Sequence, residues 1–111
     1  MIIFNEKVDY RKLDKKLQKL CDLFNKLTKK DIIATSGLRT IEENERVGGS
    51  PTSSHLKGLA IDLNCNTSQE RYEMLFTALA VGFKRIGIGR THIHLDIDED
   101  KPQNLIFFDN I

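Results

Sequence analysis

The sequence predicts a small α+β domain in which a mainly antiparallel sheet is flanked by two helices. The 111 residues include 40% hydrophobic and 30% charged side chains with a net charge of +1, which suits one folded domain spanning residues 1–111. Two segments have helical periodicity, and several short segments rich in β-branched residues are separated by glycine-containing turns. We expect the domain to be monomeric.

The charge and hydropathy patterns exclude two classes of partner. Residues 1–31 carry nine Lys or Arg and five acidic residues, whereas residues 96–111 carry five acidic residues and one Lys. This balance excludes a general basic surface, so we expect no nucleic-acid partner. No run approaches the roughly 20 apolar residues of a membrane helix, so we expect no membrane insertion. The N-terminus has no export signal.

The first expected element is an amphipathic helix over residues 10–28, whose lysine-rich faces we interpret as solvent-exposed. A strand over residues 32–36 follows and stops at Gly37. Residues 40–54 predict one helical turn and then a Gly/Ser/Pro loop of a length that is usually functional or disordered. The apolar positions of the helix are Leu13, Leu17, Leu20, Cys21, Phe24 and Leu27.

The second half of the chain predicts a strand over residues 58–64 and then a helix that begins at the capping box of Thr67 and Glu70. This helix is expected to end near Gly82. Residues 85–89 and 92–97 predict two strands joined by a tight turn, and residues 105–108 can add a last strand. The apolar positions of the helix are Tyr72, Leu75, Phe76 and Leu79.

Both cysteines, Cys21 and Cys65, are expected to be reduced and structural, because two cysteines outside a C-x-x-C pair do not form a disulfide framework. The three histidines are more informative, because they fall in two short motifs.

Side-chain alternation along two strands places polar residues on one face of the sheet. His92, His94 and Asp96 share one parity of their strand, and Asp62 lies opposite the apolar parity of the earlier strand. In residues 85–89 the matching parity consists of glycines, which we expect to leave open space over the sheet. These glycines are Gly87 and Gly89, and the apolar parities contain Leu59, Ile61, Leu63, Ile93, Leu95 and Ile97.

If these strands are neighbours, His94, Asp62 and a His55 supplied by the long loop can converge on one metal ion. Two imidazoles and one carboxylate suit zinc, which keeps a fourth position open in catalytic sites. Taken singly, each residue has an ordinary alternative role as a hydrogen-bonding surface group. The clustering of all three histidines favours the metal site.

Four short motifs follow one another in the sequence. They are Thr35-Ser36-Gly37-Leu38-Arg39, Ser53-x-His55-x-x-Gly58-x-Ala60-x-Asp62, Gly87-Ile88-Gly89 and His92-Ile93-His94-Leu95-Asp96. In this order, over about residues 32–98, they resemble the M15 peptidases, which are zinc D-alanyl-D-alanine carboxypeptidases and endopeptidases whose fold is shared by the hedgehog signalling domain. The resemblance implies that His55, Asp62 and His94 are zinc ligands and that Arg39 binds substrate or the developing oxyanion.

One position departs from the family pattern. Several members have an acidic general base three residues before the last ligand, where this chain has Thr91. His92 is our first candidate for the missing proton acceptor, because an imidazole titrates near neutrality. Asp96 is the second candidate, or else it holds the imidazole of His94 in its tautomer.

Two serines in these motifs complete the expected site. Ser36 and Ser53 are expected at the substrate-binding side, with Ser53 orienting the loop or a ligand rather than acting as a nucleophile.

The resemblance implies a Zn²⁺-dependent metallopeptidase that hydrolyses an amide bond in peptidoglycan stem or cross-link peptides. A compact chain without an export signal suggests a phage endolysin, made in the cytoplasm and acting on the cell wall after release. The alternative is a zinc-containing binding module of the same fold without catalytic activity, which Thr91 keeps open. A metal-dependent nuclease is less favoured, because the predicted polar faces lack further carboxylates for a second metal.

Overall fold

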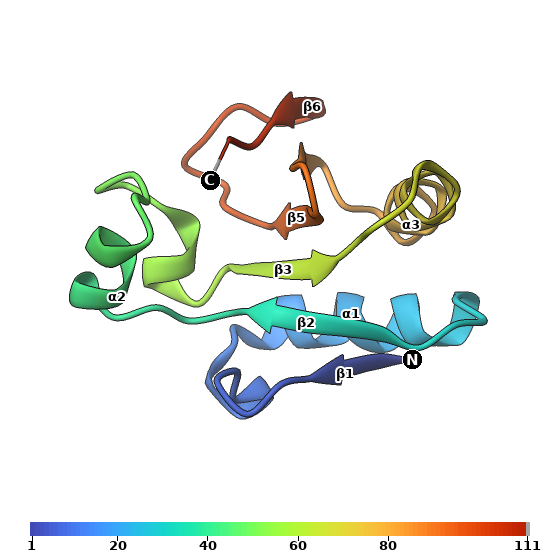
Figure 1. The fold of residues 1–111 in the computed structure, drawn as a ribbon, viewed down its shortest axis with the longest axis horizontal. Coiled ribbons are helices and arrows are strands. Elements are labelled where there is room, and N and C mark those ends of the chain that lie inside the picture. The colour runs from blue at the N-terminus through green and yellow to red at the C-terminus, as the bar shows by residue number, and fades with distance from the viewer. Residues whose placement is uncertain (111) are drawn as a thin grey trace.

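The computed structural model describes residues 1–110, which form a six-stranded mixed sheet and three helices (Figure 1). The strand order is β1-β2-β3-β5-β4-β6. The three inner pairings are antiparallel, whereas each edge strand is parallel to its neighbour. The strands are β1 (Ile2–Phe4), β2 (Ile32–Ser36), β3 (Ala60–Asn64), β4 (Arg85–Ile88), β5 (His92–Asp96) and β6 (Leu105–Phe108), and the helices are α1 (Lys15–Leu27), α2 (Ile41–Arg46) and α3 (Ser68–Val81).

The α+β class and the mainly antiparallel sheet are confirmed, with two differences at the N-terminal end. The first helix begins at Lys15 rather than near residue 10, because the Asp14 side chain accepts a hydrogen bond from the Lys16 N–H at 2.8 Å and so caps the helix there. Residues 10–12 form a separate 3-10 turn, η1. The short strand β1 was not expected, and it pairs with β2 at the sheet edge.

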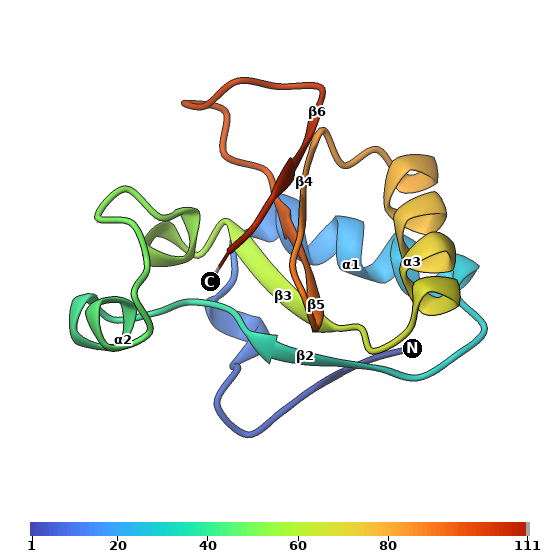
Figure 2. The same cartoon turned by 45° about the horizontal axis from the view of Figure 1, so that its top comes forward.

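Helices α1 and α3 cover one face of the sheet and enclose the hydrophobic core. Figure 2 shows the two helices on the same side of β3 and β5. Both cysteines lie in this core as free thiols, as predicted. Burial raises the pKa of Cys21 to about 12. The core residues with no exposed surface include Leu17, Cys21, Ile61, Leu63, Cys65, Ala78, Ile93 and Leu95.

Of the four apolar positions at helical spacing in α3, Leu75 alone packs against the core. Tyr72 is 73% exposed, Phe76 66% and Leu79 53%. The helix instead buries Met74, Thr77 and Ala78. Met74 and Ala78 belong to the hydrophobic core, so the buried face of the helix differs from the face that Tyr72, Phe76 and Leu79 share.

The open space expected over Gly87 and Gly89 is also absent. A Cβ on Gly87 would lie 2.9 Å from the ring of Phe107, and a Cβ on Gly89 would collide with the imidazole of His92. The glycines therefore make room for two aromatic rings that lie on the polar side of the sheet. The ring of Phe107 in turn contacts His94 edge-on, with 5.7 Å between ring centroids.

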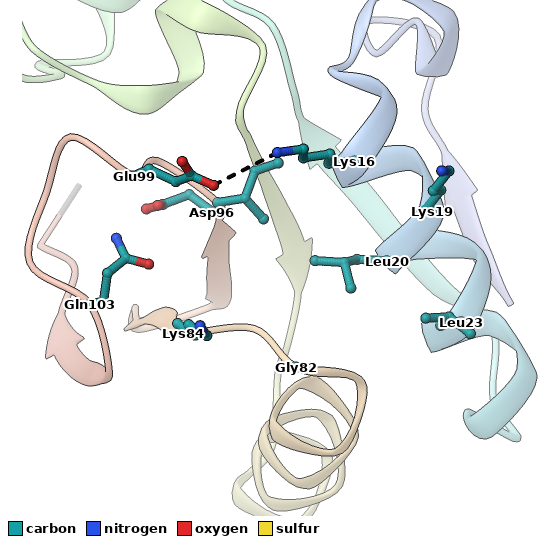
Figure 3. Close-up of a pocket in the computed structure, with 10 residues that line it drawn as sticks. Lys16, Lys19, Leu20, Leu23, Gly82, Lys84, Asp96, Glu99 and Gln103 are labelled. Atoms are coloured by element: carbon teal, nitrogen blue, oxygen red, sulfur yellow. Dashed lines mark ion pairs between the residues drawn. The ribbon is translucent and has the colours of Figure 1, made fainter.

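A cavity of about 600 Å³ lies beside α1 and the C-terminal end of α3 (Figure 3). Its walls include Leu20, Leu23 and Lys84, and Lys16 reaches Glu99 at 3.8 Å across it. None of the three predicted metal ligands lines this cavity. No helix within residues 1–110 is long and apolar enough to cross a membrane.

Candidate metal centre

The sheet register brings two of the predicted ligands together. Asp62 on β3 and His94 on β5 are direct cross-strand partners, so their side chains project from the same face. This is the face opposite α1 and α3, since the neighbouring residues Ile61 and Leu95 lie in the core.

His55 reaches the same place from the 3-10 turn η2 (Ser54–Lys57). Ser53 caps this turn, because its hydroxyl accepts a hydrogen bond from the His55 N–H at 3.2 Å. Gly58 ends the turn with a φ of 71°, a left-handed conformation that glycine adopts without strain. The chain can therefore turn directly from His55 into β3.

Both imidazoles direct one nitrogen at the same carboxylate oxygen. His55 Nε2 and His94 Nδ1 each lie 3.2 Å from Asp62 Oδ1. The opposite nitrogens are held by acceptors, with His55 Nδ1 2.7 Å from the Gly37 carbonyl and His94 Nε2 2.7 Å from Asp96 Oδ2. All three side chains are buried, and these contacts hold the two imidazole rings in place.

The protonation of this cluster follows from these contacts. Burial alone would raise the pKa of Asp62, but hydrogen bonds with His55 and His94 outweigh it and hold the pKa well below its usual range. Burial alone would lower the pKa of His94, but hydrogen bonds with Asp62 and Asp96 raise it to about 9. The cluster is therefore a carboxylate facing an imidazole that retains its proton at neutral pH.

The three residues fit a metal ion. One ligand atom from each of His55, Asp62 and His94 lies within 4.8 Å of the others. Each imidazole already has an outer hydrogen bond of the kind that orients metal-binding histidines. A cation bound by these three residues would meet two nitrogens and one carboxylate oxygen, a donor set typical of transition metals.

Arg39 closes one side of this cluster. Its guanidinium donates to Asp62 Oδ2 at 3.2 Å, to the Ser36 hydroxyl at 3.1 Å and to Asn44 Oδ1 at 3.3 Å. Its backbone N–H donates to the His55 carbonyl at 3.0 Å. Ser36 thus holds Arg39, and Arg39 holds the second oxygen of the metal-facing carboxylate. Asn44 was not predicted, because nothing in its sequence context distinguishes it from a surface asparagine.

Asp96 lies behind His94 and is 1% exposed. Its other oxygen, Oδ1, accepts hydrogen bonds from Arg85 Nε at 2.8 Å and from the Asp98 N–H at 3.0 Å. Asp96 therefore has the position of a residue that orients the imidazole of His94. Arg85 was not predicted, because its strand was interpreted only from its alternating glycine and isoleucine residues.

His92 lies beside the cluster and contacts a residue that the sequence did not predict. His92 Nε2 is 2.8 Å from Asp109 Oδ2, and one ligand atom from each of these two residues and Asp62 lies within 4.8 Å of the others. The hydrogen bond with Asp109 raises the pKa of His92 against the effect of burial. Burial raises the pKa of Asp109, but contacts with His92 and His94 outweigh it, so the net shift is downward.

A cleft of about 130 Å³ lies on the polar side of the sheet. Two of the predicted ligands, His55 and His94, border it and can be reached by a ligand from that side. The residues around it include Arg39, Ser53, His55, His94, Phe107 and Asp109.

Comparison with known proteins agrees with this arrangement. The family model described as Peptidase M15 matches residues 3–98, which include every predicted ligand. A search among curated proteins finds no significant match. Because the family model covers most of the chain, and the motif residues meet in one cluster in the fold, this protein belongs to the M15 peptidase family.

Proposed function

We propose that the protein is a zinc-dependent peptidase that hydrolyses an amide bond in peptidoglycan stem or cross-link peptides. The observation that carries the proposal is the buried cluster of His55, Asp62 and His94, of which His55 and His94 border a cleft. Family membership supports peptide hydrolysis, and the cleft supports access of a substrate group to the cluster.

Zinc is the metal we favour, because two imidazoles and one carboxylate are the protein ligands of many catalytic zinc sites. Such sites keep a fourth position for water or substrate, in contrast to structural sites closed by four ligands. When bound, zinc polarises a carbonyl group and activates water for attack.

Arg39 is the residue we assign to the substrate carbonyl or carboxylate. Its guanidinium borders the cleft and is only 9% exposed, so water competes little for its hydrogen bonds. Three protein acceptors fix its plane, which favours a directed interaction over a mobile surface charge. Ser36 and Ser53 support this side of the site by holding Arg39 and the backbone of His55.

His92 is the residue we assign to proton exchange with the water and the departing amine. Its Nε2 edge faces Asp62 and Asp109, beside the ligands, and its side chain is 14% exposed. Thr91, which precedes it, has no group that can accept a proton at neutral pH. A binding module without activity is the competing function, and Thr91 is the observation that favours it.

The test is to incubate purified muropeptides with the zinc-loaded wild type, His92→Ala and His94→Ala, and to identify products by mass spectrometry. We expect the wild type to release an amino acid or peptide, and His94→Ala to lose both zinc and activity. His92→Ala should keep zinc and lose about 10²- to 10⁴-fold in kcat.

A fully zinc-occupied wild type that releases nothing from any wall peptide would contradict the peptidase proposal and favour the binding module. The endolysin role and the site of action remain predictions from the sequence. Comparing activity on intact cells with activity on purified walls would test whether the protein needs to be delivered to its substrate.

A further inference from the structure

The chain after β6 places the carboxylate of Asp109 beside the predicted metal ligands, outside the residues that the family model matches. Asp109 follows Phe108, the last residue of β6, and lies beyond residues 3–98. Its backbone N–H donates to the Ile88 carbonyl at 2.8 Å, which continues the parallel pairing of β6 with β4. Alternation along the strand then places Asp109 on the same face as Phe107, the face of the cluster. Figure 2 shows β6 running alongside β4.

Asp109 lies between the imidazole of His92 and a predicted ligand. Its Oδ2 is 2.8 Å from His92 Nε2 and 3.9 Å from His94 Nδ1, the nitrogen that faces Asp62. The side chain is 16% exposed and borders the cleft. Asp109 therefore borders both the predicted ligand His94 and the cleft through which a substrate group would approach.

We propose that Asp109 is a catalytic residue of the peptidase proposed above, and that it works as an acid–base pair with His92. The pair supplies the carboxylate that is missing at position 91. This inference rests on the proposed function, because it assigns a further residue to the same reaction.

The proposed step is balanced in protons. Asp109 accepts a proton from water as the water oxygen bonds to the carbonyl carbon. His92, as the imidazolium, gives its Nε2 proton to the amide nitrogen as the carbon–nitrogen bond breaks, and it keeps the proton on Nδ1. The proton on Asp109 then passes to His92 Nε2 across the hydrogen bond between them. The exchange with water assigned to His92 above therefore runs through Asp109, and both residues are restored for the next turnover.

The test compares Asp109→Asn, Asp109→Glu, His92→Ala and the double variant Asp109→Asn/His92→Ala in the zinc-loaded protein. Asp100→Asn is the matched control, because Asp100 is 87% exposed and does not border the cleft. Each variant is assayed for kcat and KM on the muropeptide that the wild type cleaves. Zinc affinity is measured separately by competition with a chelator, and folding by the thermal unfolding midpoint.

Asp109→Asn is expected to lower kcat about 10²- to 10³-fold while KM and zinc affinity stay within about threefold of wild type. Asp109→Glu keeps a carboxylate and should retain more activity. The double variant should be no worse than the more impaired single variant, because two members of one acid–base pair act as a unit. Asp100→Asn should match the wild type.

Three results would overturn the proposal. A tenfold or greater loss of zinc affinity in Asp109→Asn would make Asp109 a metal ligand. A kcat of Asp109→Asn above half that of the wild type would show that Asp109 takes no part in the reaction. If the losses of the two single variants multiply in the double variant, Asp109 and His92 act independently and not as a pair. A wild type that is inactive at full zinc occupancy would instead refute the proposed function itself, whereas these three results require an active wild type.

Discussion

The two faces of the sheet bury adjacent residues for different reasons. Ile61 and Asp62 follow one another on β3 and are 0% and 7% exposed. Ile61 lies in the core that α1 and α3 enclose, where removal of apolar surface from water is favourable. Asp62 is buried only together with Arg39, His55 and His94, because an isolated carboxylate would lose too much solvation.

Stability and function therefore depend on opposite faces of the same strands. Buried ion pairs contribute little net stability, since desolvation opposes their attraction, and removal of one partner leaves the others unpaired. The helix-covered face should therefore account for most of the free energy of unfolding of the metal-free protein. The polar face gains its stabilisation when a ligand binds the folded state and not the unfolded chain.

The largest expected effect is on the helix-covered face. Ile61→Ala removes a fully buried side chain and should lower the free energy of unfolding of the metal-free protein by about 2–5 kcal/mol. Urea denaturation measures this change. Ile106→Ala is the control, because Ile106 is 51% exposed and its loss should cost within about 0.5 kcal/mol. Equal effects at the two positions would contradict the assignment of the core.

The next prediction concerns the change in the free energy of unfolding when zinc binds, which should depend on the polar face alone. Zinc at about 100 times its Kd should raise the free energy of unfolding by about 2.7 kcal/mol. The increment should be the same in Ile61→Ala, whose metal centre is intact, and absent in His94→Ala. Paired urea titrations with and without zinc measure it. An increment that survives in His94→Ala would show that zinc binds elsewhere.

A third effect concerns the pH dependence of the polar face. The pKa of His94 in the metal-free protein is about 9, so the imidazole is protonated at neutral pH and zinc must displace that proton. Zinc affinity should therefore rise about tenfold for each pH unit between pH 6.5 and 8.5, which is about 1.4 kcal/mol per unit, and level off above pH 9. Chelator competition at several pH values measures the slope. A slope near zero would contradict the protonated imidazole.

The alternation of β3 and β5 was sufficient to predict which residues share the polar face. The motifs then indicated that His55 joins Asp62 and His94, and the structure brings the three together. The partner of His92 could not be predicted in the same way. Asp109 is 17 residues away from it in sequence and lies outside every motif, so their contact depends on how β6 pairs with β4.

The burial of side chains on α3 could not be predicted from the sequence, for a different physical reason. Apolar residues at helical spacing predict a buried stripe only if the largest side chains are the ones that fit against the sheet. In this helix Met74 and Ala78 occupy the contact with the core, and Tyr72 and Phe76 remain outside. Periodicity alone cannot choose between two stripes when both contain apolar residues.

The smallest expected effect tests that corrected face. Tyr72→Lys and Phe76→Lys should each change the free energy of unfolding by no more than about 0.5 kcal/mol, because both side chains are more than 60% exposed. Met74→Ala, one turn or less away on the same helix, should cost about 2–5 kcal/mol, because Met74 is 4% exposed. Urea denaturation of the metal-free variants compares the three. If the aromatic substitutions destabilise the protein more than Met74→Ala does, the face of Tyr72 and Phe76 is the buried one; if they do not, the helix contributes to the core through Met74 and its neighbours on that face.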